Sequence, residues 1–322
     1  PNPAESEHDL LENSHASASL SWASGLATGF ELTGHQHRRV VAIIGDGSMT
    51  GGMAFEALNN LGHYGQRAVI ILNDNGRSYA PTVSRLATVM SRLRQSPNYL
   101  KGRQAVTNIL DRLPLGVEVK RGLSGAAAAM REMWEPPAFF ETLGVRYLGP
   151  IDGHDIAALE SALRDASSYE DGPIVVHVLT DKGRGYAPAE ADEEKHLHDI
   201  GLFDPATGNS PSAGGANFTS EFSSALLDIA DRRADVVAIT AAMPGSTGLI
   251  PFQDRYPDRF FDVGIAEQHA LTSAAGMARA GLRPFVAIYS TFLARGFDQV
   301  MYDIGLHRLP VIICIDRAGV TG

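Results

Sequence analysis

The hydrophobic pattern of the chain alternates between short apolar runs and segments of helical periodicity. Residues 40–44 and 69–72 are rich in Val and Ile and end at glycine or Asx residues, which is typical of buried parallel strands. Between them, apolar residues recur at spacings of three and four, which predicts a helix. These residues are Met53, Ala54, Ala57, Leu58 and Leu61. The pattern therefore predicts a β-α-β unit whose two strands end at one sheet edge, where open α/β sheets bind ligands.

The same pattern recurs along the chain and predicts a second α/β unit. Further strands are predicted at 145–148, 174–179, 236–240, 260–263, 285–289 and 311–315, and further helices at 156–166 and 219–232. Asp155 is the predicted N-cap of the first of these helices. A later amphipathic helix is predicted to have an apolar face made of Phe292, Phe297, Val300, Met301 and Ile304.

The predicted elements define the fold class as α/β, with two doubly wound parallel-sheet domains. We expect the first domain at 1–186, a linker rich in Pro, Gly, Ser and acids at 187–217, and the second domain at 218–322. Residues 76–144 contain several prolines and predict an irregular helical excursion, with its clearest helix at 123–134. The chain stops soon after a predicted strand, so we expect both domains to be incomplete and the chain to be the middle of a longer protein.

Composition narrows the class of protein. The formal net charge of -10 argues against nucleic-acid binding and against a basic membrane-binding surface. The single cysteine, Cys314, lies inside an apolar run, so a disulfide framework is not expected and a reducing cytoplasm is the predicted location. No apolar run approaches the roughly 20 residues that a membrane-spanning helix requires.

Oxygen-bearing side chains follow the first two predicted strands. Asp46 lies in a Gly-Asp-Gly sequence after the first strand, and Asn73 and Asn75 follow the second. Because both strands end at one edge, we expect a carboxylate and amide oxygens to meet there, which suits Mg²⁺ and the oxygens of a diphosphate. Gly51 and Gly52 lie where the amides at a helix N-terminus are exposed to an anion. A tight turn is the alternative interpretation of Gly-Asp-Gly taken alone.

The spacing of these residues resembles the thiamine diphosphate motif, in which an asparagine follows Gly-Asp-Gly at a fixed distance. Here residues 48–74 separate Gly47 from Asn75. With the second predicted domain included, the whole chain resembles the 1-deoxy-D-xylulose-5-phosphate synthase family of transketolase-like enzymes. The further matching segments are 5–9, 149–154, 182–186, 189–192, 262–269, 287–293 and 316–319.

The resemblance implies a transferase that uses thiamine diphosphate and Mg²⁺. Such an enzyme condenses pyruvate with D-glyceraldehyde 3-phosphate and releases CO2, giving 1-deoxy-D-xylulose 5-phosphate for isoprenoid precursor, thiamine and pyridoxal synthesis. It implies a homodimer, a diphosphate-binding first domain and a pyrimidine-binding second domain. Another transketolase-like thiamine diphosphate enzyme, and a non-catalytic fragment that keeps the fold, are the alternatives.

The resemblance also implies the residues that hold the metal and the cofactor. The metal ligands are the side chains of Asp46 and Asn75 and the backbone carbonyl of Arg77. The implied cofactor contacts are Ser14, His15, Ala16, Gly47, Ser48, Asn75, Tyr186, Glu267 and Phe292. From its own segment alone, His15 is interpreted as a capping or surface histidine. The sequence departs from many family members after Asn75, at residues 76–79, which affects only the side chain of the third ligand.

The catalytic and substrate residues are implied in the same way. Glu267 resembles the glutamate that faces N1′ of the cofactor's aminopyrimidine, whereas its position alone indicates an acid in the first turn of a helix. His198 resembles a linker histidine that reaches the active site, and His196 stays possible because the local spacing varies within the family. The residues that match positions holding the phosphate of glyceraldehyde 3-phosphate are Tyr289, Arg295 and Arg317.

Overall fold

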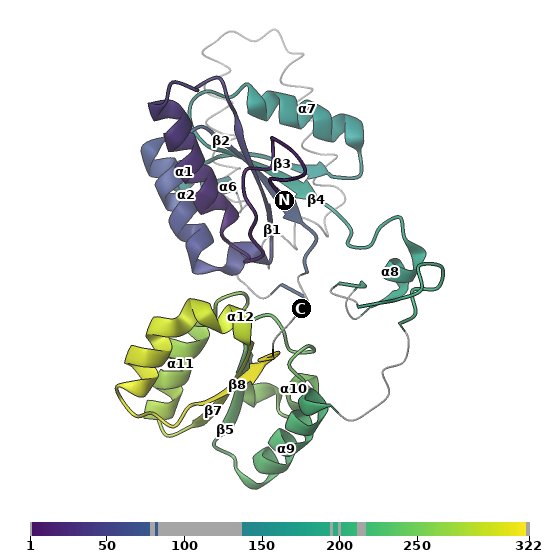
Figure 1. Ribbon diagram of the computed structural model, residues 1–322, viewed down its shortest axis with the longest axis vertical. Coiled ribbons are helices and arrows are strands. Elements are labelled where there is room, and N and C mark those ends of the chain that lie inside the picture. The colour runs from purple at the N-terminus through teal and green to yellow at the C-terminus, as the bar shows by residue number, and fades with distance from the viewer. Residues whose placement is uncertain are drawn as a thin grey trace, which may run out of the picture. The chain divides into compact units, whose positions relative to one another are not determined.

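The chain forms two compact α/β units, which we describe separately (Figure 1). The computed structural model describes residues 2–77, 81–82, 137–193, 196–198, 201–210 and 217–319. Among these residues, the first unit holds 2–76 and 137–181, and the second holds the others. The predicted helix at 123–134 lies outside the described residues, as does most of the predicted excursion.

The first unit is built on a sheet of four parallel strands in the order β1-β2-β4-β3. The strands are β1 (Val40–Gly45), β2 (Ala68–Asp74), β3 (Arg146–Asp152) and β4 (Ile174–Leu179). Apolar β-branched residues fill β2 and β4, because both faces of these central strands are covered. The strands predicted from apolar runs in this part of the chain are therefore confirmed.

Helices cover both faces of this sheet (Figure 1). The helices are α1 (Ser19–Leu32), α2 (Gly52–Tyr64), α6 (Pro137–Thr142) and α7 (Ile156–Ser167). α1, α2 and α6 contribute Leu20, Leu58 and Phe140 to the core on one face, whereas α7 packs on the other face through Ala162. Asp155 caps α7, because its carboxylate accepts the backbone N–H of Ala158 at 3.0 Å, as the sequence predicted.

The second unit repeats this architecture with the strand order β6-β5-β7-β8, and all its strand pairs are parallel. Its strands are β5 (Val236–Thr240), β6 (Phe260–Asp262), β7 (Arg283–Tyr289) and β8 (Ile312–Asp316). The helices α9 (Phe218–Arg232) and α10 (Ile250–Arg255) pack on one face, and α11 (Glu267–Arg279) packs on the other. Two parallel-sheet α/β domains are therefore the fold of the chain.

The segment expected to link the two domains contains a short helix, α8 (Ala187–Ala191). Pro188 lies in the first turn of α8, where the missing N–H costs nothing. On its C-terminal side, α9 begins with a capping box in which Asn217 and Ser220 exchange hydrogen bonds. None of the helices within the described ranges has the length and apolar character of a membrane-spanning segment.

The structure corrects two predicted apolar faces. Met53 is exposed, so the first turn of α2 does not bury it. After β7, the predicted single helix is broken into α12 (Ser290–Leu293), a 3₁₀ turn and a π-helix (Gln299–Gly305). Phe297, which follows the 3₁₀ turn, is 67% exposed, and Met301 in the π-helix is 48% exposed, because each change of helix type shifts the phase on which a period of 3.6 residues depends.

Gly62 in α2 provides a test of the packing between α2 and the loop after α6. A Cβ atom at this position would lie 1.7 Å from the backbone oxygen of Leu143, whereas one at Gly29 in α1 would meet no atom within 4 Å. We expect Gly62→Ala to lower the free energy of unfolding by about 1–3 kcal/mol or more through overpacking. Gly29→Ala is the matched control and should raise it by up to about 1 kcal/mol through helix propensity. Chemical denaturation measures both, and equal effects would contradict the close approach.

Candidate metal and cofactor site

The carboxyl ends of β1 and β2 form one corner of the first unit. The two strands pair in parallel up to Gly45 and Asn73, and the backbone N–H of Asp46 donates to the carbonyl of Asn73 at 3.2 Å. The backbone N–H of Asn75 in turn donates to Oδ1 of Asp46 at 3.3 Å. The structure therefore brings Asp46 and Asn75, the two predicted side-chain metal ligands, next to each other.

The groups at this corner fit a hard divalent cation. Asp46 is buried, and its carboxylate and the amide oxygen of Asn75 are oxygen donors of the kind that Mg²⁺ prefers. Within the described residues, no group of three or more His, Cys, Asp and Glu side chains is placed to hold a metal ion. Arg77 belongs to the second unit, where its Nη2 donates to the carbonyl of Glu193 at 3.2 Å.

The loop that follows Asp46 is tied to the segment before α1. Ser17 is buried and adopts a positive φ of 69°, and its hydroxyl donates to the carbonyl of Ser48 at 2.6 Å. This bond ties the residue that follows the predicted cofactor residues 14–16 to the loop that contains Gly47 and Ser48. His15 is exposed, and its backbone N–H donates to the side chain of Asn13 at 2.8 Å. The sequence did not indicate Ser17, because neither its positive φ nor its distant hydrogen-bond partner can be predicted from the pattern of residues.

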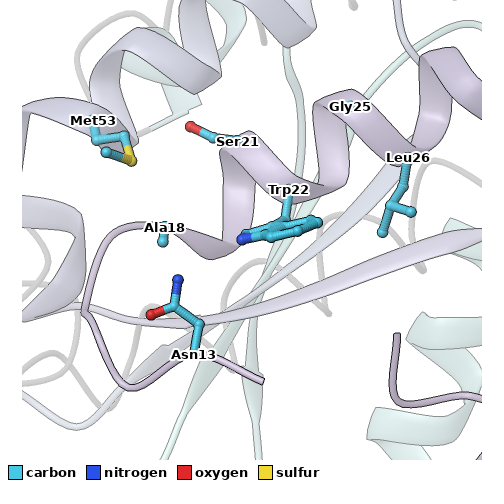
Figure 2. A pocket seen from close by; sticks show the side chains of 7 residues that line it. All are labelled: Asn13, Ala18, Ser21, Trp22, Gly25, Leu26 and Met53. Carbon is cyan, nitrogen blue, oxygen red and sulfur yellow. The ribbon is translucent and has the colours of Figure 1, made fainter. Parts of the chain in front are cut away.

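A separate pocket of about 540 Å³ opens beside α1 (Figure 2). Its lining residues are Asn13, Ala18, Ser21, Trp22, Gly25, Leu26 and Met53. Figure 2 shows the side chains of Trp22 and Leu26 projecting from the same side of α1. The lining is mainly apolar and carries no charged side chain, so it does not suit a diphosphate.

In the second unit, Glu267 is the first residue of α11 and is buried. Nη1 of Arg295 lies 3.7 Å from Oε2 of Glu267. The structure therefore pairs the predicted catalytic acid with a residue predicted to hold a substrate phosphate. Removing a carboxylate from water is costly unless charge and hydrogen bonds compensate, and Arg295 supplies positive charge at this position.

The aromatic and basic residues after β7 and β8 form a second cluster in this unit. The rings of Tyr289 and Phe292 stack with centroids 5.6 Å apart and an interplanar angle of 15°. The guanidinium of Arg317 lies 4.0 Å from the centre of the Tyr289 ring, a distance suited to a cation–π interaction. The hydroxyl of Ser290 donates to the carbonyl of Arg317 at 2.8 Å and helps to hold it at a positive φ of 53°. The structure thus brings Tyr289, Phe292 and Arg317 together.

Asp262, which sequence reasoning missed, organises the turn that leads to Glu267. Its Oδ1 accepts the backbone N–H groups of Ala242 at 2.8 Å and Gly264 at 3.0 Å. Burial raises the pKa of the Asp262 carboxyl above its usual value, although the two backbone N–H donors act in the opposite direction. An Asp that ends a strand and precedes a glycine by two residues is the signal that the sequence carried for this role.

The linker residues lie in the second unit. The hydroxyl of Tyr186 donates to the carbonyl of Pro205 at 2.6 Å. Nδ1 of His196 donates to the carbonyl of Ala189 at 3.1 Å, a contact that ties its ring to α8. His198 lies half-buried in the same turn. The roles of His196 and His198 stay predictions.

Comparison with known proteins follows the division into two units. Residues 215–322 match the family model described as transketolase, pyrimidine binding domain, and the fold of two parallel-sheet domains places the chain in the transketolase-like class. Residues 1–180 match the family model described as 1-deoxy-D-xylulose-5-phosphate synthase. The chain therefore belongs to the 1-deoxy-D-xylulose-5-phosphate synthase family.

Curated relatives extend over the whole chain. The 1-deoxy-D-xylulose-5-phosphate synthase of Mycolicibacterium paratuberculosis is 53% identical over 323 residues, covering 100% of this chain and 50% of the relative. Those of Mycobacterium sp. (strain KMS) and Mycobacteroides abscessus are each 54% identical with the same coverage. The chain spans about half the length of the curated relatives it matches. A solved structure described as a split gene transketolase, inactive beta4 tetramer, shares 33% identity over 30% of this chain and 32% of its own, with a TM-score of 0.28.

The raised pKa of Asp262 predicts how its replacement changes stability with pH. The protonated carboxyl is favoured in the folded protein, so its contribution is fully present below the unfolded pKa of about 3.9 and is lost as pH rises through the folded value. The side chain of Asp262→Asn stays neutral at every pH. We therefore expect the unfolding free energy of the variant minus that of the parent to increase as pH rises from about 4 to 7. Chemical denaturation across this range measures the difference.

The matched control for this experiment is Asp228→Asn, which makes the same change in charge at an exposed position on α9. The difference in unfolding free energy between Asp228→Asn and the parent should not increase with pH in this way. A difference for Asp262→Asn that stays constant with pH, or that shrinks as pH rises, would contradict the effect of burial.

Proposed function

We propose that the protein catalyses the thiamine diphosphate- and Mg²⁺-dependent condensation of pyruvate with D-glyceraldehyde 3-phosphate, giving 1-deoxy-D-xylulose 5-phosphate and CO2. Membership of the 1-deoxy-D-xylulose-5-phosphate synthase family supports this proposal. The observation that carries it is the contact between Asp46 and Asn75 at the edge of the first sheet. The proposal includes a cytoplasmic homodimer that makes isoprenoid precursors.

In this proposal, the diphosphate end of the cofactor binds at the edge of the first sheet. The side chains of Asp46 and Asn75, with the carbonyl of Arg77, hold Mg²⁺. The backbone at Gly47 and Ser48 approaches the diphosphate, and residues 14–16 contact the cofactor beside that loop. The bond from Ser17 to Ser48 supports this arrangement, because it fixes the two segments to each other.

The second unit holds the aminopyrimidine end. When bound, thiamine diphosphate supplies a nucleophilic carbon that adds to the keto group of pyruvate and an electron sink for decarboxylation. The Glu267 carboxyl would hold a proton against ring atom N1′ of the cofactor, and this hydrogen bond would support the activation of that carbon. Phe292 packs on the pyrimidine, and Tyr186 contacts the cofactor. The burial of Glu267 supports this role, since it strengthens a hydrogen bond made at a low local dielectric.

The remaining residues bind substrate. The reaction breaks the bond between C1 and C2 of pyruvate, releases CO2, and joins C2 to the aldehyde carbon of glyceraldehyde 3-phosphate, with one proton taken up by the new hydroxyl group. Tyr289, Arg295 and Arg317 bind the phosphate of this second substrate, and guanidinium groups suit phosphate oxygens. His198 reaches the reacting groups from the linker and moves a proton there.

We assign residues 1–186 to a diphosphate-binding domain, 187–217 to the linker and 218–322 to a pyrimidine-binding domain. The two compact units support this division, because the first unit ends at residue 181 and the second continues from residue 182. The two family models match ranges close to these domain boundaries, residues 1–180 and 215–322.

Glu267→Gln tests the proposed catalytic acid in the full chain. We expect turnover of pyruvate and glyceraldehyde 3-phosphate to fall by at least about 100-fold, because an amide cannot exchange the proton at N1′, while the cofactor still binds. The control is Glu221→Gln, an exposed acid in the first turn of α9 that shares only the interaction with the helix dipole. Steady-state rates and calorimetric cofactor binding measure the two effects. A Glu267→Gln enzyme with the parent's rate would remove Glu267 from this role.

Asp46→Asn tests the proposed metal site. We expect the dissociation constant of Mg²⁺ at saturating thiamine diphosphate to rise by at least about tenfold, because a neutral amide replaces the carboxylate. Asp165→Asn, at an exposed position on α7, is the control for the change in charge. Titration calorimetry measures both affinities, and cofactor binding that is unaffected by Mg²⁺ would indicate a scaffold. Assays that compare pyruvate with a ketose donor distinguish the proposed reaction from that of a transketolase.

A further inference from the structure

Three polar side chains form a hydrogen-bonded chain across β3, β4 and β2 of the first unit. The hydroxyl of Tyr147 lies 2.7 Å from Nδ1 of His177, and Nε2 of His177 lies 3.0 Å from Oδ2 of Asp74. All three residues are buried, with exposed fractions of 5%, 0% and 1% respectively. These three hydrogen-bonded side chains cross a sheet face whose other residues form the apolar core under α1, α2 and α6.

The chemistry of the three groups sets the direction of the hydrogen bonds. An ionised carboxylate can only accept, so Nε2 of His177 donates to Asp74. In the neutral imidazole that donates from Nε2, Nδ1 is the acceptor and receives the hydroxyl proton of Tyr147. One tautomer of His177 therefore satisfies both neighbours at once.

Backbone geometry fixes where His177 lies. It is paired with Leu72 in the register between β2 and β4, so Asp74 lies two residues further along on the same face. On the other side, β3 approaches closely at Gly149, where a Cβ atom would lie 2.6 Å from the carbonyl oxygen of His177. The imidazole is therefore held between two strands by main-chain packing as well as by its hydrogen bonds.

Asp74 connects this chain to the corner that holds Asp46. The carbonyl of Asp74 accepts the backbone N–H of Thr180 at 3.0 Å, and the hydroxyl of Thr180 donates to Oδ1 of Asn73 at 2.6 Å. The next residue, Asn75, donates its backbone N–H to Asp46. The end of β2 is thus bound on the β4 side through Asp74 and on the β1 side through Asn75.

Stability alone does not account for this arrangement. Burying a carboxylate costs several kcal/mol before partners compensate, and well-packed apolar residues of similar volume are often equally or more stabilising. The polar chain ends one residue before a predicted metal ligand. Outer residues that orient ligands through hydrogen bonds are a general feature of metal sites.

We propose that His177 is a positioning residue, which fixes Asp74 and thereby the backbone at Asn75 in the geometry that binds Mg²⁺ and the diphosphate. This proposal rests on the function proposed above. His177 acts through Asp74 and does not touch the metal or the cofactor.

The test compares His177→Gln with His177→Asn in the full chain. A glutamine amide extends to the position of Nε2 and can still donate to Asp74, whereas the shorter asparagine reaches only the position of Nδ1. We expect the dissociation constant of Mg²⁺ at saturating thiamine diphosphate to rise about tenfold in His177→Asn and to stay within about 1.5-fold of the parent in His177→Gln. Titration calorimetry on folded protein measures it, with the unfolding free energy of each variant recorded alongside.

Val176→Ala is the control for a loss of stability without a loss of positioning. Val176 is buried in the same strand but faces the core under α7. It should lower the unfolding free energy and leave the dissociation constant of Mg²⁺ unchanged. Equal affinities for His177→Asn and the parent, or an equal loss for His177→Asn and Val176→Ala, would overturn the positioning role.

Two further variants keep the test decisive. If neither His177 variant folds, Tyr147→Phe provides the test, because it removes only the outer hydroxyl and keeps the ring stacked on Phe140. We expect about a threefold loss of Mg²⁺ affinity for this variant, and an unchanged affinity would overturn the proposal. Asp46→Asn separates the two levels of inference. If it leaves Mg²⁺ affinity unchanged, the proposed metal site fails and the role of His177 fails with it. If it weakens Mg²⁺ binding while both His177 variants bind like the parent, only the positioning role is wrong.

Discussion

The in-register parallel pairing of β1 with β2 is the constraint on which the rest of the first unit depends. The six residue pairs run from Val40 and Ala68 to Gly45 and Asn73. Because the strands are parallel, the polar residues that follow them emerge at the same edge. A slip of one residue would turn every side chain of one strand to the opposite face and separate Asp46 from Asn75. The apolar residues of β2, which are buried on both faces of the sheet, make that slip costly.

The second unit applies the same rule to different chemistry. Its strands β7 and β8 end at Tyr289 and Asp316, and the aromatic stack and Arg317 follow directly. Glu267 reaches its own sheet edge as the first residue of α11, where a helix N-terminus favours negative charge. Thus one unit presents oxygen donors suited to a cation, and the other presents a buried acid with aromatic and basic groups.

Most of the strands could be predicted from the sequence, because Val- and Ile-rich runs of four to seven residues have few alternatives in a parallel sheet. The candidate residues at the strand ends could also be predicted, because they follow directly after these runs. The sequence did not reveal the 3₁₀ turn and the π-helix after β7, whose changed periods leave Phe297 and Met301 exposed. Nor did it indicate Ser17, because its role depends on a positive φ and on a backbone partner distant in the sequence.

His177 shows most clearly what an apolar pattern conceals. It lies inside β4, where the neighbouring apolar residues hide the polar one, and its partners Asp74 and Tyr147 become visible only once the strand order and register are known. The hydrogen bond from His177 to Asp74 lies at the carboxyl end of β2, one residue before Asn75. Hydrogen bonds made within the protein fix this edge before any ligand arrives, so less ordering remains to be done when one binds. A buried polar chain there is therefore better explained by preorganisation of a binding site than by stability of the sheet.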